Sequence, residues 1–218
     1  MRSPRAIVAH DADVDVLLSH SSVDPKAAKG LVQSAVFTRG PKQLSNTAVW
    51  VGGSRVSDGE EVFDEIQKAF FGPFQVSVML DSNGCNTTAA TSVALLAKEL
   101  DLEIAEPKDD DELAEAVDGA SIVLAAGPAG VELLPKAIWT KLGEAEVLVD
   151  FNAAEPLGIE GSDAQDSFEQ REGKKVLGAL AVGGPKMKVH KACVRKLFES
   201  NDVILDAEGV YTIAKELV

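Results

Sequence analysis

The stretch VSVMLDSNGCNTTAATSVALLAKEL, residues 76–100, contains the change of pattern that decides the fold. Residues 76–80 are mostly apolar and β-branched, as in a buried strand, whereas residues 87–100 place apolar side chains at the spacing of a helix face. A strand that leads directly into a helix is the repeating unit of parallel-sheet proteins. The sequence therefore predicts an α/β fold.

The turn between this strand and this helix, DSNGCNTT at residues 81–88, is dense in short polar side chains. We expect Gly84 to adopt a positive φ and Asn86 to cap the helix. Ligands of open α/β sheets bind beyond the carboxyl ends of the strands, where such turns present N–H groups. The turn is therefore a candidate binding site. The alternative is a tight turn followed by a helix cap, with no ligand.

The composition is that of a globular chain whose partners are small molecules or proteins. Of the 218 residues, 45% are hydrophobic and 26% are charged, which is ordinary for a domain with its own core. The formal net charge is −14 and no long basic run interrupts the acidic balance, so we expect no nucleic acid partner.

The amino end and the cysteine usage predict a cytoplasmic protein. No apolar run reaches the length of a membrane span, and residues 1–18 include acidic residues where a signal peptide would be hydrophobic. Cys85 and Cys193 are too few for a disulfide framework, and neither they nor the three histidines have metal-site spacing. We expect reduced thiols, no membrane contact and no bound metal.

Strands and helices alternate along the rest of the chain. Strands are expected at residues 15–20, 47–51, 76–80, 102–105, 121–126, 147–151 and 176–182. Helices are expected at residues 24–35, 61–71, 87–100, 109–117, 131–142, 185–199 and 206–217, with caps from Asp24, a Ser57–Glu60 capping box and Asp206. This alternation is typical of parallel sheets.

Two loops leave open whether they meet a ligand. Arg39 and Lys42 surround a Gly-Pro turn, and their cations could meet an acidic ligand or simply be solvated. The aromatic residues of 70–74 could stack on a flat ring, or pack the corner between a helix and a strand.

Three turns follow consecutive expected strands, at Gly127, Asn152 and Gly183. This arrangement suits the lip of a nucleotide-type site. The chain nevertheless contains no G-x-G-x-x-G and no G-x-x-x-x-G-K-[ST] sequence, so neither common phosphate-binding loop is present.

Lys186 breaks a local rule. The expected helix after Pro185 would place this cation in the first turn, where the helix dipole opposes it by roughly 0.3–1 kcal/mol. Such violations are found most often at functional sites. The alternative is that Lys186 extends into solvent together with Lys188 and Lys191.

Six stretches spread over residues 37–200 resemble the NADP-dependent methylene-tetrahydromethanopterin dehydrogenases of one-carbon metabolism, some of which also accept methylene-tetrahydrofolate. They are FTRGPK (37–42), TAVWVGG (47–53), FFGPFQVSVMLDSNGCNTTAA (70–90), AAGPAGVELLP (125–135), DFNAAEPLGIEGSDA (150–164) and GALAVGGPKMKVHKACVRKLFES (178–200). The resemblance implies a pterin-binding α/β domain at residues 1–101, a Rossmann-like domain at 102–184, and helices at 185–218 that return to the first domain.

The chain departs from this family in one large respect. Members of the family begin their Rossmann domain just after the helix that matches residues 90–100, with a strand and a glycine-rich loop. Here residues 98–104 pass almost directly to the acidic helix. Two strand–helix units, roughly 60 residues at about 30 per unit, are missing from the expected pattern. We therefore expect a shortened Rossmann-like domain that lacks the glycine-rich loop.

The resemblance implies a hydride transfer from a reduced pterin to NADP, catalysed by a homo-oligomer. It assigns Lys186 to the reacting centre and Asp15 to the pterin side. It also implies that the pterin is bound by the turn that contains Asp81, Asn83, Gly84, Asn86, Thr87 and Thr88. The nicotinamide side is assigned to Gly127, Pro128, Ala129, Gly130, Asn152 and Ala153. Two alternatives stay open: a pterin-binding protein without redox activity, and a structural or regulatory subunit of full-length relatives.

Overall fold

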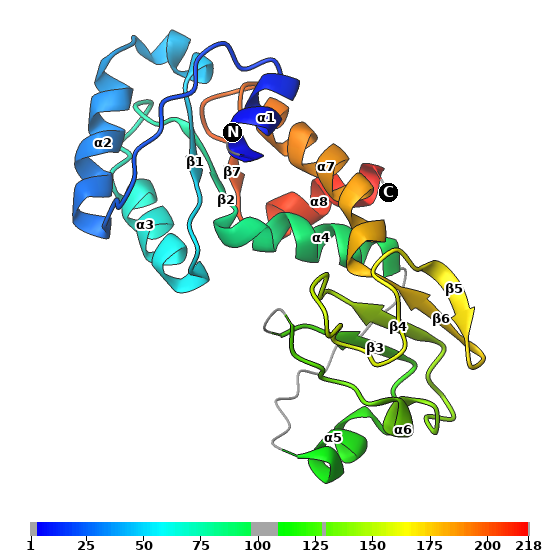
Figure 1. Ribbon diagram of the computed structural model, residues 1–218. Coiled ribbons are helices and arrows are strands. Elements are labelled where there is room, and N and C mark those ends of the chain that lie inside the picture. The colour runs from blue at the N-terminus through cyan, green and yellow to red at the C-terminus, as the bar shows by residue number, and fades with distance from the viewer. Residues whose placement is uncertain (1–3, 97–108, 128–129, 218) are drawn as a thin grey trace. The chain divides into compact units, whose positions relative to one another are not determined.

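The computed structural model describes residues 4–96, 109–127 and 130–217 (Figure 1). It divides the chain into two compact units, one made of Met1–Lys98 with Pro185–Val218 and one made of Glu99–Gly184. These are unit 1 and unit 2. Both contain parallel strands, which confirms the predicted α/β class.

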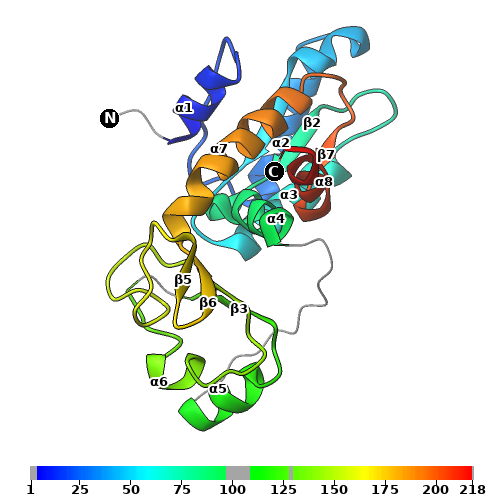
Figure 2. The same ribbon diagram turned by 90° about the vertical axis from the view of Figure 1, so that its right-hand side faces the viewer.

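Unit 1 has a three-stranded parallel sheet with helices on both faces, as Figures 1 and 2 show. Its elements are α1 (Pro4–Asp11), α2 (Pro25–Phe37), the 3-10 helix η1 (Pro41–Asn46), β1 (Ala48–Val51), α3 (Val56–Lys68), β2 (Ser77–Leu80), the 3-10 helix η2 (Ser82–Gly84), α4 (Cys85–Leu96), α7 (Ala179–Lys196), β7 (Ile204–Leu205) and α8 (Ala207–Leu217). The strand order is β1-β2-β7.

The polar turn of residues 81–88 follows the central strand β2, which is buried on both faces of the sheet. All four residues of β2 are buried. Val78 and Leu80 pack with α2 and α3, while Met79 packs with α4, α7 and α8 on the opposite face. Because alternate side chains of a strand point to opposite faces, a strand covered on both sides needs a nearly continuous apolar run.

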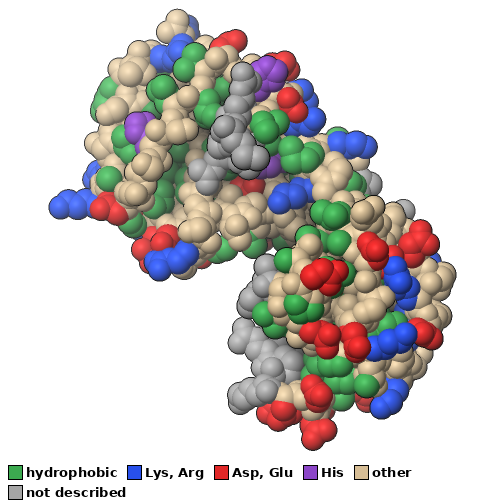
Figure 3. Space-filling view, in the orientation of Figure 1, with side chains coloured by type: hydrophobic (Ala, Val, Ile, Leu, Met, Phe, Trp, Pro, Cys, Tyr) green, Lys and Arg blue, Asp and Glu red, His purple; other side chains and the backbone are tan. Residues whose placement is uncertain are grey.

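Unit 2 is built on a four-stranded sheet of order β3-β4-β6-β5, parallel except for the antiparallel edge strand β5. Its elements are α5 (Asp110–Val117), β3 (Ile122–Ala125), α6 (Lys136–Trp139), β4 (Val147–Asp150), β5 (Ser167–Arg171) and β6 (Lys174–Leu177). Acidic and basic residues balance in unit 1, so the net charge of −14 falls on unit 2. Figure 3 shows the gathering of Asp and Glu side chains on its surface.

Two of the expected helix caps are confirmed. The Asp24 carboxylate accepts a hydrogen bond of 2.7 Å from the Ala27 amide at the start of α2. The Asp206 carboxylate accepts one of 2.9 Å from the Gly209 amide at the start of α8. Short side chains with an oxygen acceptor satisfy the N–H groups that a helix start leaves unpaired.

The strand expected at residues 15–20 is not formed. This segment pairs with no strand, and Val16 and Leu18 are 72% and 77% exposed. Alternation of apolar residues was therefore a misleading signal here, because a strand also needs a partner edge. The strand expected at residues 102–105 lies outside the described residues.

The helix expected at residues 131–142 is formed only over the four residues of α6. The amides of Leu133 and Leu134 both donate to the Gly158 carbonyl, and Leu134 forms a bridge to Ile159. Pro135 follows, and a residue before proline is disfavoured in helical conformation. The chain therefore runs extended where apolar spacing predicted a helix.

The strand expected at residues 176–182 ends at Leu177, and α7 begins at Ala179. A Cβ on Gly178 would overlap the carbonyl oxygens of Asp163 and Ala164, so only glycine fits at this corner. Gly183 lies inside α7 rather than in a turn. Lys186 therefore stands in mid-helix, and both the predicted turn and the predicted conflict with the helix dipole were wrong.

Smaller differences concern two helix starts and one strand. α3 begins at Val56, five residues before the expected start, so the expected capping box lies within the helix. α4 begins at Cys85, so Asn86 is inside it and is not the cap. The edge strand β5 lies between the strands expected at residues 147–151 and 176–182, where no strand was expected.

Candidate functional site

The turn after β2 is held together by a buried carboxylate. Asp81 is 3% exposed. Its carboxylate accepts hydrogen bonds from the Thr87 amide at 3.0 Å and from the Thr87 hydroxyl at 3.0 Å. Asp81 therefore ties the end of the strand to the first turn of α4. Asp81 and Thr87 are both buried, so they position the turn and do not form its surface.

The outer part of the turn consists of the other residues predicted to contact a ligand. Asn83 is exposed, and Gly84, Asn86 and Thr88 are half-buried. Gly84 has φ +68°, as predicted from its residue type, and Asn83 has φ +53°. The Asn86 side chain donates to the Leu80 carbonyl at 2.8 Å, and the Thr88 hydroxyl donates to the Gly84 carbonyl at 2.7 Å.

Lys186 of α7 lies against this turn, although the two are far apart in the sequence. A Cβ built on Gly84 would stand 2.7 Å from Nζ of Lys186 and 3.6 Å from its Cε. Lys186 is half-buried, and within the described part of the chain its ammonium has no hydrogen bond or ion pair. Lys188 is exposed, and Lys191 lies 3.6 Å from the Asp11 carboxylate. Lys186 thus does not share the environment of its neighbours.

His190 and Trp50 complete the cluster, and sequence analysis did not single out either residue. His190 is one helical turn beyond Lys186, and its Nε2 lies 3.5 Å from Oδ2 of Asp81. Its ring lies in a T-shaped arrangement with the ring of Trp50, at a centroid distance of 4.7 Å and an interplanar angle of 75°. Burial lowers the pKa of His190 below its ordinary value, and the Lys186 charge lowers it further, while Asp81 raises it. The net effect favours the neutral imidazole.

Glycine also allows α3 to approach the turn closely. A Cβ on Gly59 would overlap the Ser82 hydroxyl and would stand 3.3 Å from Cδ1 of Leu80. Ser82 is 2% exposed, and its hydroxyl has no hydrogen-bond partner among the residues described. The turn is thus packed between α3 on one side and α7 on the other.

Asp15 follows Val14, which packs against the same apolar cluster as Trp50 and Met187. Asp15 itself lies in the exposed segment after α1, and no hydrogen bond or ion pair connects it to the turn within the described ranges.

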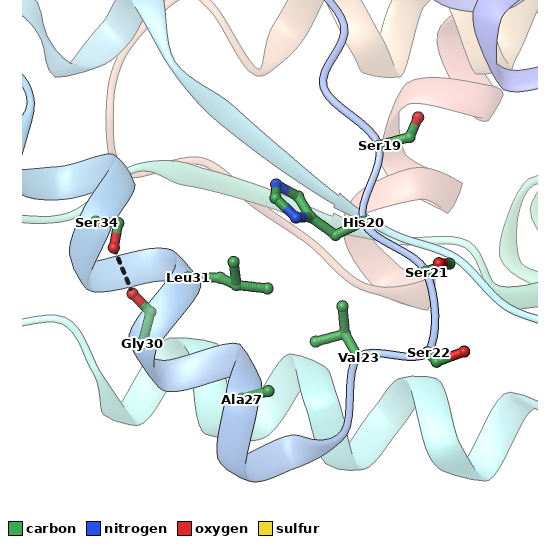
Figure 4. Close-up of a pocket in the computed structure, with 9 residues that line it drawn as sticks. All are labelled: Ser19, His20, Ser21, Ser22, Val23, Ala27, Gly30, Leu31 and Ser34. Atoms are coloured by element: carbon green, nitrogen blue, oxygen red, sulfur yellow. Dashed lines mark hydrogen bonds between the residues drawn. The ribbon is translucent and has the colours of Figure 1, made fainter.

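A cavity of about 620 Å³ is lined by the segment Ser19–Val23, which follows Asp15 in the sequence, and by Ala27, Gly30, Leu31 and Ser34 of α2 (Figure 4). None of the predicted site residues lines this cavity.

In unit 2, two loops at the carboxyl ends of β3 and β4 are joined by a buried amide. Oδ1 of Asn152 accepts from the Gly130 amide at 3.3 Å and from the Ala154 amide at 3.0 Å. Its Nδ2 donates to the Pro156 carbonyl at 3.1 Å. Asn152 thus holds the loops, and of its side-chain amide only the second hydrogen of Nδ2 is left without a bond to the described residues of these loops. Gly127 and Ala153 are exposed beside it, and Pro128 and Ala129 lie outside the described residues.

Asp150 anchors the second of these loops. It is fully buried, and its carboxylate accepts from the amides of Asn152 and Ile159 at 2.8 Å each and from the Ser162 hydroxyl at 3.1 Å. Gly158 packs so closely that a Cβ on it would stand 2.7 Å from Oδ1 of Asp150. The position of the Asn152 loop therefore depends on a buried charge that is compensated by three donors.

The described residues of unit 2 fit one end of a dinucleotide and not the other. Exposed glycine-bearing loops beyond β3 and β4 suit a flat nicotinamide ring. Within the described part, no helix of eight or more residues follows either strand to receive a pyrophosphate, and the net acidic charge of the unit opposes phosphate. No group of three metal-ligating side chains occurs among the described residues.

Comparison with known proteins identifies the relatives of this chain. Residues 5–83 match the family described as methylene-tetrahydromethanopterin dehydrogenase, N-terminal. The bifunctional protein MdtA of Methylorubrum extorquens is 37% identical over an alignment that covers 97% of this chain and 93% of that protein. The NAD(P)-dependent methylenetetrahydromethanopterin dehydrogenase of the same organism is 27% identical, with coverages of 96% and 92%.

The alignment with MdtA also bears on the length of the chain. It runs over 267 residues, which is 49 more than the 218 residues present here. At least that many aligned positions therefore have no counterpart in this chain. The crystal structure of a transhydrogenase from Sinorhizobium meliloti aligns with 99% of this chain and 59% of its own, at 17% identity and a TM-score of 0.32.

Proposed function

This chain belongs to the methylene-tetrahydromethanopterin dehydrogenase family, and from that premise we propose that it transfers a hydride from a methylene-bearing reduced pterin to NADP. The substrate would be methylene-tetrahydromethanopterin or methylene-tetrahydrofolate. A C–H bond of the methylene carbon breaks, and its electron pair leaves with the hydride. The carbon then becomes a methenyl cation shared between two pterin nitrogens. NADP, when bound, supplies the hydride acceptor.

No acid or base is required in this step, so the chain contributes binding, orientation and exclusion of water.

The observation that carries the proposal is the close approach of Lys186 to the turn of residues 81–88. A half-buried ammonium without a described partner, beside a turn fixed by Asp81, is a preorganised contact for a polar heterocycle. A purely structural remnant would need neither feature.

Each unit has a separate part in this proposal. In unit 1, Asn83, Gly84, Asn86 and Thr88 would contact the pterin, and Lys186 would act at the reacting centre. Asp81 and Thr87 would keep the turn in place, and Asp15 stays a proposed contact on the pterin side. In unit 2, the exposed Gly127 and Ala153, with Pro128, Ala129 and Gly130, would line the nicotinamide, while Asn152 holds their loops.

A second candidate function is binding of a reduced pterin without redox chemistry. It is favoured by the 49 or more aligned positions that are missing here and by the lack of a pyrophosphate-binding helix start after β3 and β4 in the described part of the chain. We propose a homo-oligomer in either case, on the resemblance to the family. We also propose a cytoplasmic location, which the free thiols of Cys85 and Cys193 favour. No helix in the described residues could cross a membrane.

Calorimetric titration of the folded protein with NADP distinguishes the two candidates. The dehydrogenase proposal predicts saturable binding in the micromolar range, about −8 kcal/mol. Absence of heat, from a protein that still binds the reduced pterin, would leave the second candidate.

Turnover should then be measured as NADPH absorbance. Lys186→Ala is expected to lower kcat/KM with the fold intact, whereas Lys188→Ala, two residues away and exposed, is expected to match the parent. Equal rates for the two variants would contradict the role given to Lys186.

A further inference from the structure

The place of the Lys186 ammonium coincides with the space that a side chain at position 84 would fill. A Cβ on Gly84 would stand 2.7 Å from Nζ of Lys186, too close unless the ammonium moves, and 3.6 Å from Cε, an ordinary contact. Gly84 also has φ +68°, a conformation that L-residues other than glycine adopt at a cost. The positive φ favours glycine, and a Cβ at this position would have to displace the flexible end of Lys186.

We infer that Gly84 is a positioning residue for Lys186: its missing side chain defines where the ammonium lies above the turn. Lys186 itself belongs to α7, on which His190 faces Asp81 at 3.5 Å one turn away. The lysine is thus confined by its own helix and by the backbone of the turn. A residue with a Cβ at position 84 would push the ammonium out toward solvent.

The expected effect of Gly84 on catalysis rests on the proposed function, but its effect on the position of the Lys186 ammonium does not. Amine acetylation with acetic anhydride, quantified by peptide mass spectrometry, reports how accessible Lys186 is relative to the exposed Lys188 in the same peptide region. This ratio is measurable in an enzyme and in an inactive protein alike. A failure of the dehydrogenase proposal therefore leaves the inference about Gly84 testable.

Two variants add a Cβ at position 84. One control variant separates the effect of backbone strain from that of displacing the Lys186 ammonium. Gly84→Ala adds the Cβ alone, and Gly84→Asn adds it in the non-glycine residue that best tolerates positive φ. Gly72→Ala is the control, because Gly72 also has a positive φ, +53°, but no atom lies within 4 Å of its Cβ position. Gly72 has no part in the proposed site.

The expected result is a rise of at least threefold in the Lys186-to-Lys188 labelling ratio in both Gly84 variants and an unchanged ratio in Gly72→Ala. In an active enzyme, Gly84→Ala should lower kcat/KM about as much as Lys186→Ala. The double variant should have a kcat/KM no lower than that of Lys186→Ala, since both changes remove the same contact. An unchanged ratio in the folded Gly84→Asn protein would overturn the inference, as would losses that multiply in the double variant.

Discussion

Replacing Asp81 by asparagine tests whether a buried carboxylate organises the candidate site. The substitution keeps the shape of the side chain but removes its charge. Two hydrogen bonds from Thr87, one from its amide and one from its hydroxyl, then lose a charged acceptor. Charge-assisted bonds contribute about 1.5–3 kcal/mol each and neutral ones about 0.5–1.5 kcal/mol. Asp81→Asn should therefore lower the free energy of unfolding by about 2 kcal/mol.

The assay is urea denaturation, with hydrogen exchange of the β2 amides as the signal that belongs to unit 1. A shift of midpoint without a change of slope gives the difference in stability. Asp15→Asn is the matched control, because Asp15 is exposed, and it should stay within about 0.5 kcal/mol of the parent. If Asp81→Asn is as stable as the control, the carboxylate does not hold the turn and the description of the site is wrong.

Four further predictions concern pH, packing, thiols and salt. Because the folded pKa of His190 is lowered, unit 1 should lose stability as pH falls below about 6.5, by up to about 1.4 kcal/mol per pH unit, and His190→Phe should remove this loss in urea titrations. Gly59→Ala should cost about 1–3 kcal/mol in thermal denaturation, and Ser82→Ala should recover part of it, since the added Cβ meets the Ser82 hydroxyl first. A thiol reagent should modify the exposed Cys85 in the native protein but Cys193 only after unfolding, because burial raises the pKa of Cys193 to about 12. The NADP dissociation constant should fall, or stay level, as salt is raised from low concentration, since screening weakens repulsion from the acidic unit 2.

The part of the fold that local sequence determines was predictable. The change from a continuous apolar run to helical spacing placed β2 and α4, and short oxygen-bearing residues at helix starts gave the caps of α2 and α8. The ends of helices and strands were predicted wrongly where a tertiary contact determines them. Gly178 turns the chain because two carbonyl oxygens leave room for nothing larger, and residues 133–134 stay extended because they bond to Gly158.

The candidate site was predictable only in pieces. Gly84 could be assigned a positive φ from its type, and Lys186 could be singled out, although for a helix position that it does not occupy. Their contact depends on the packing of α7, which no local pattern encodes. His190 and Trp50 were not singled out, since a lone histidine and a lone tryptophan in apolar surroundings are usual core residues. The spacing of four from Lys186 was the one clue to His190.

Isotope transfer tests the central claim most directly. The protein is incubated with NADP and a methylene-tetrahydromethanopterin or methylene-tetrahydrofolate that carries deuterium on the methylene carbon, and the reduced nucleotide is analysed by mass spectrometry. Direct hydride transfer predicts NADPH that contains the substrate deuterium, with none exchanged for solvent protons. Folded protein that binds the pterin but forms no deuterated NADPH would contradict the account.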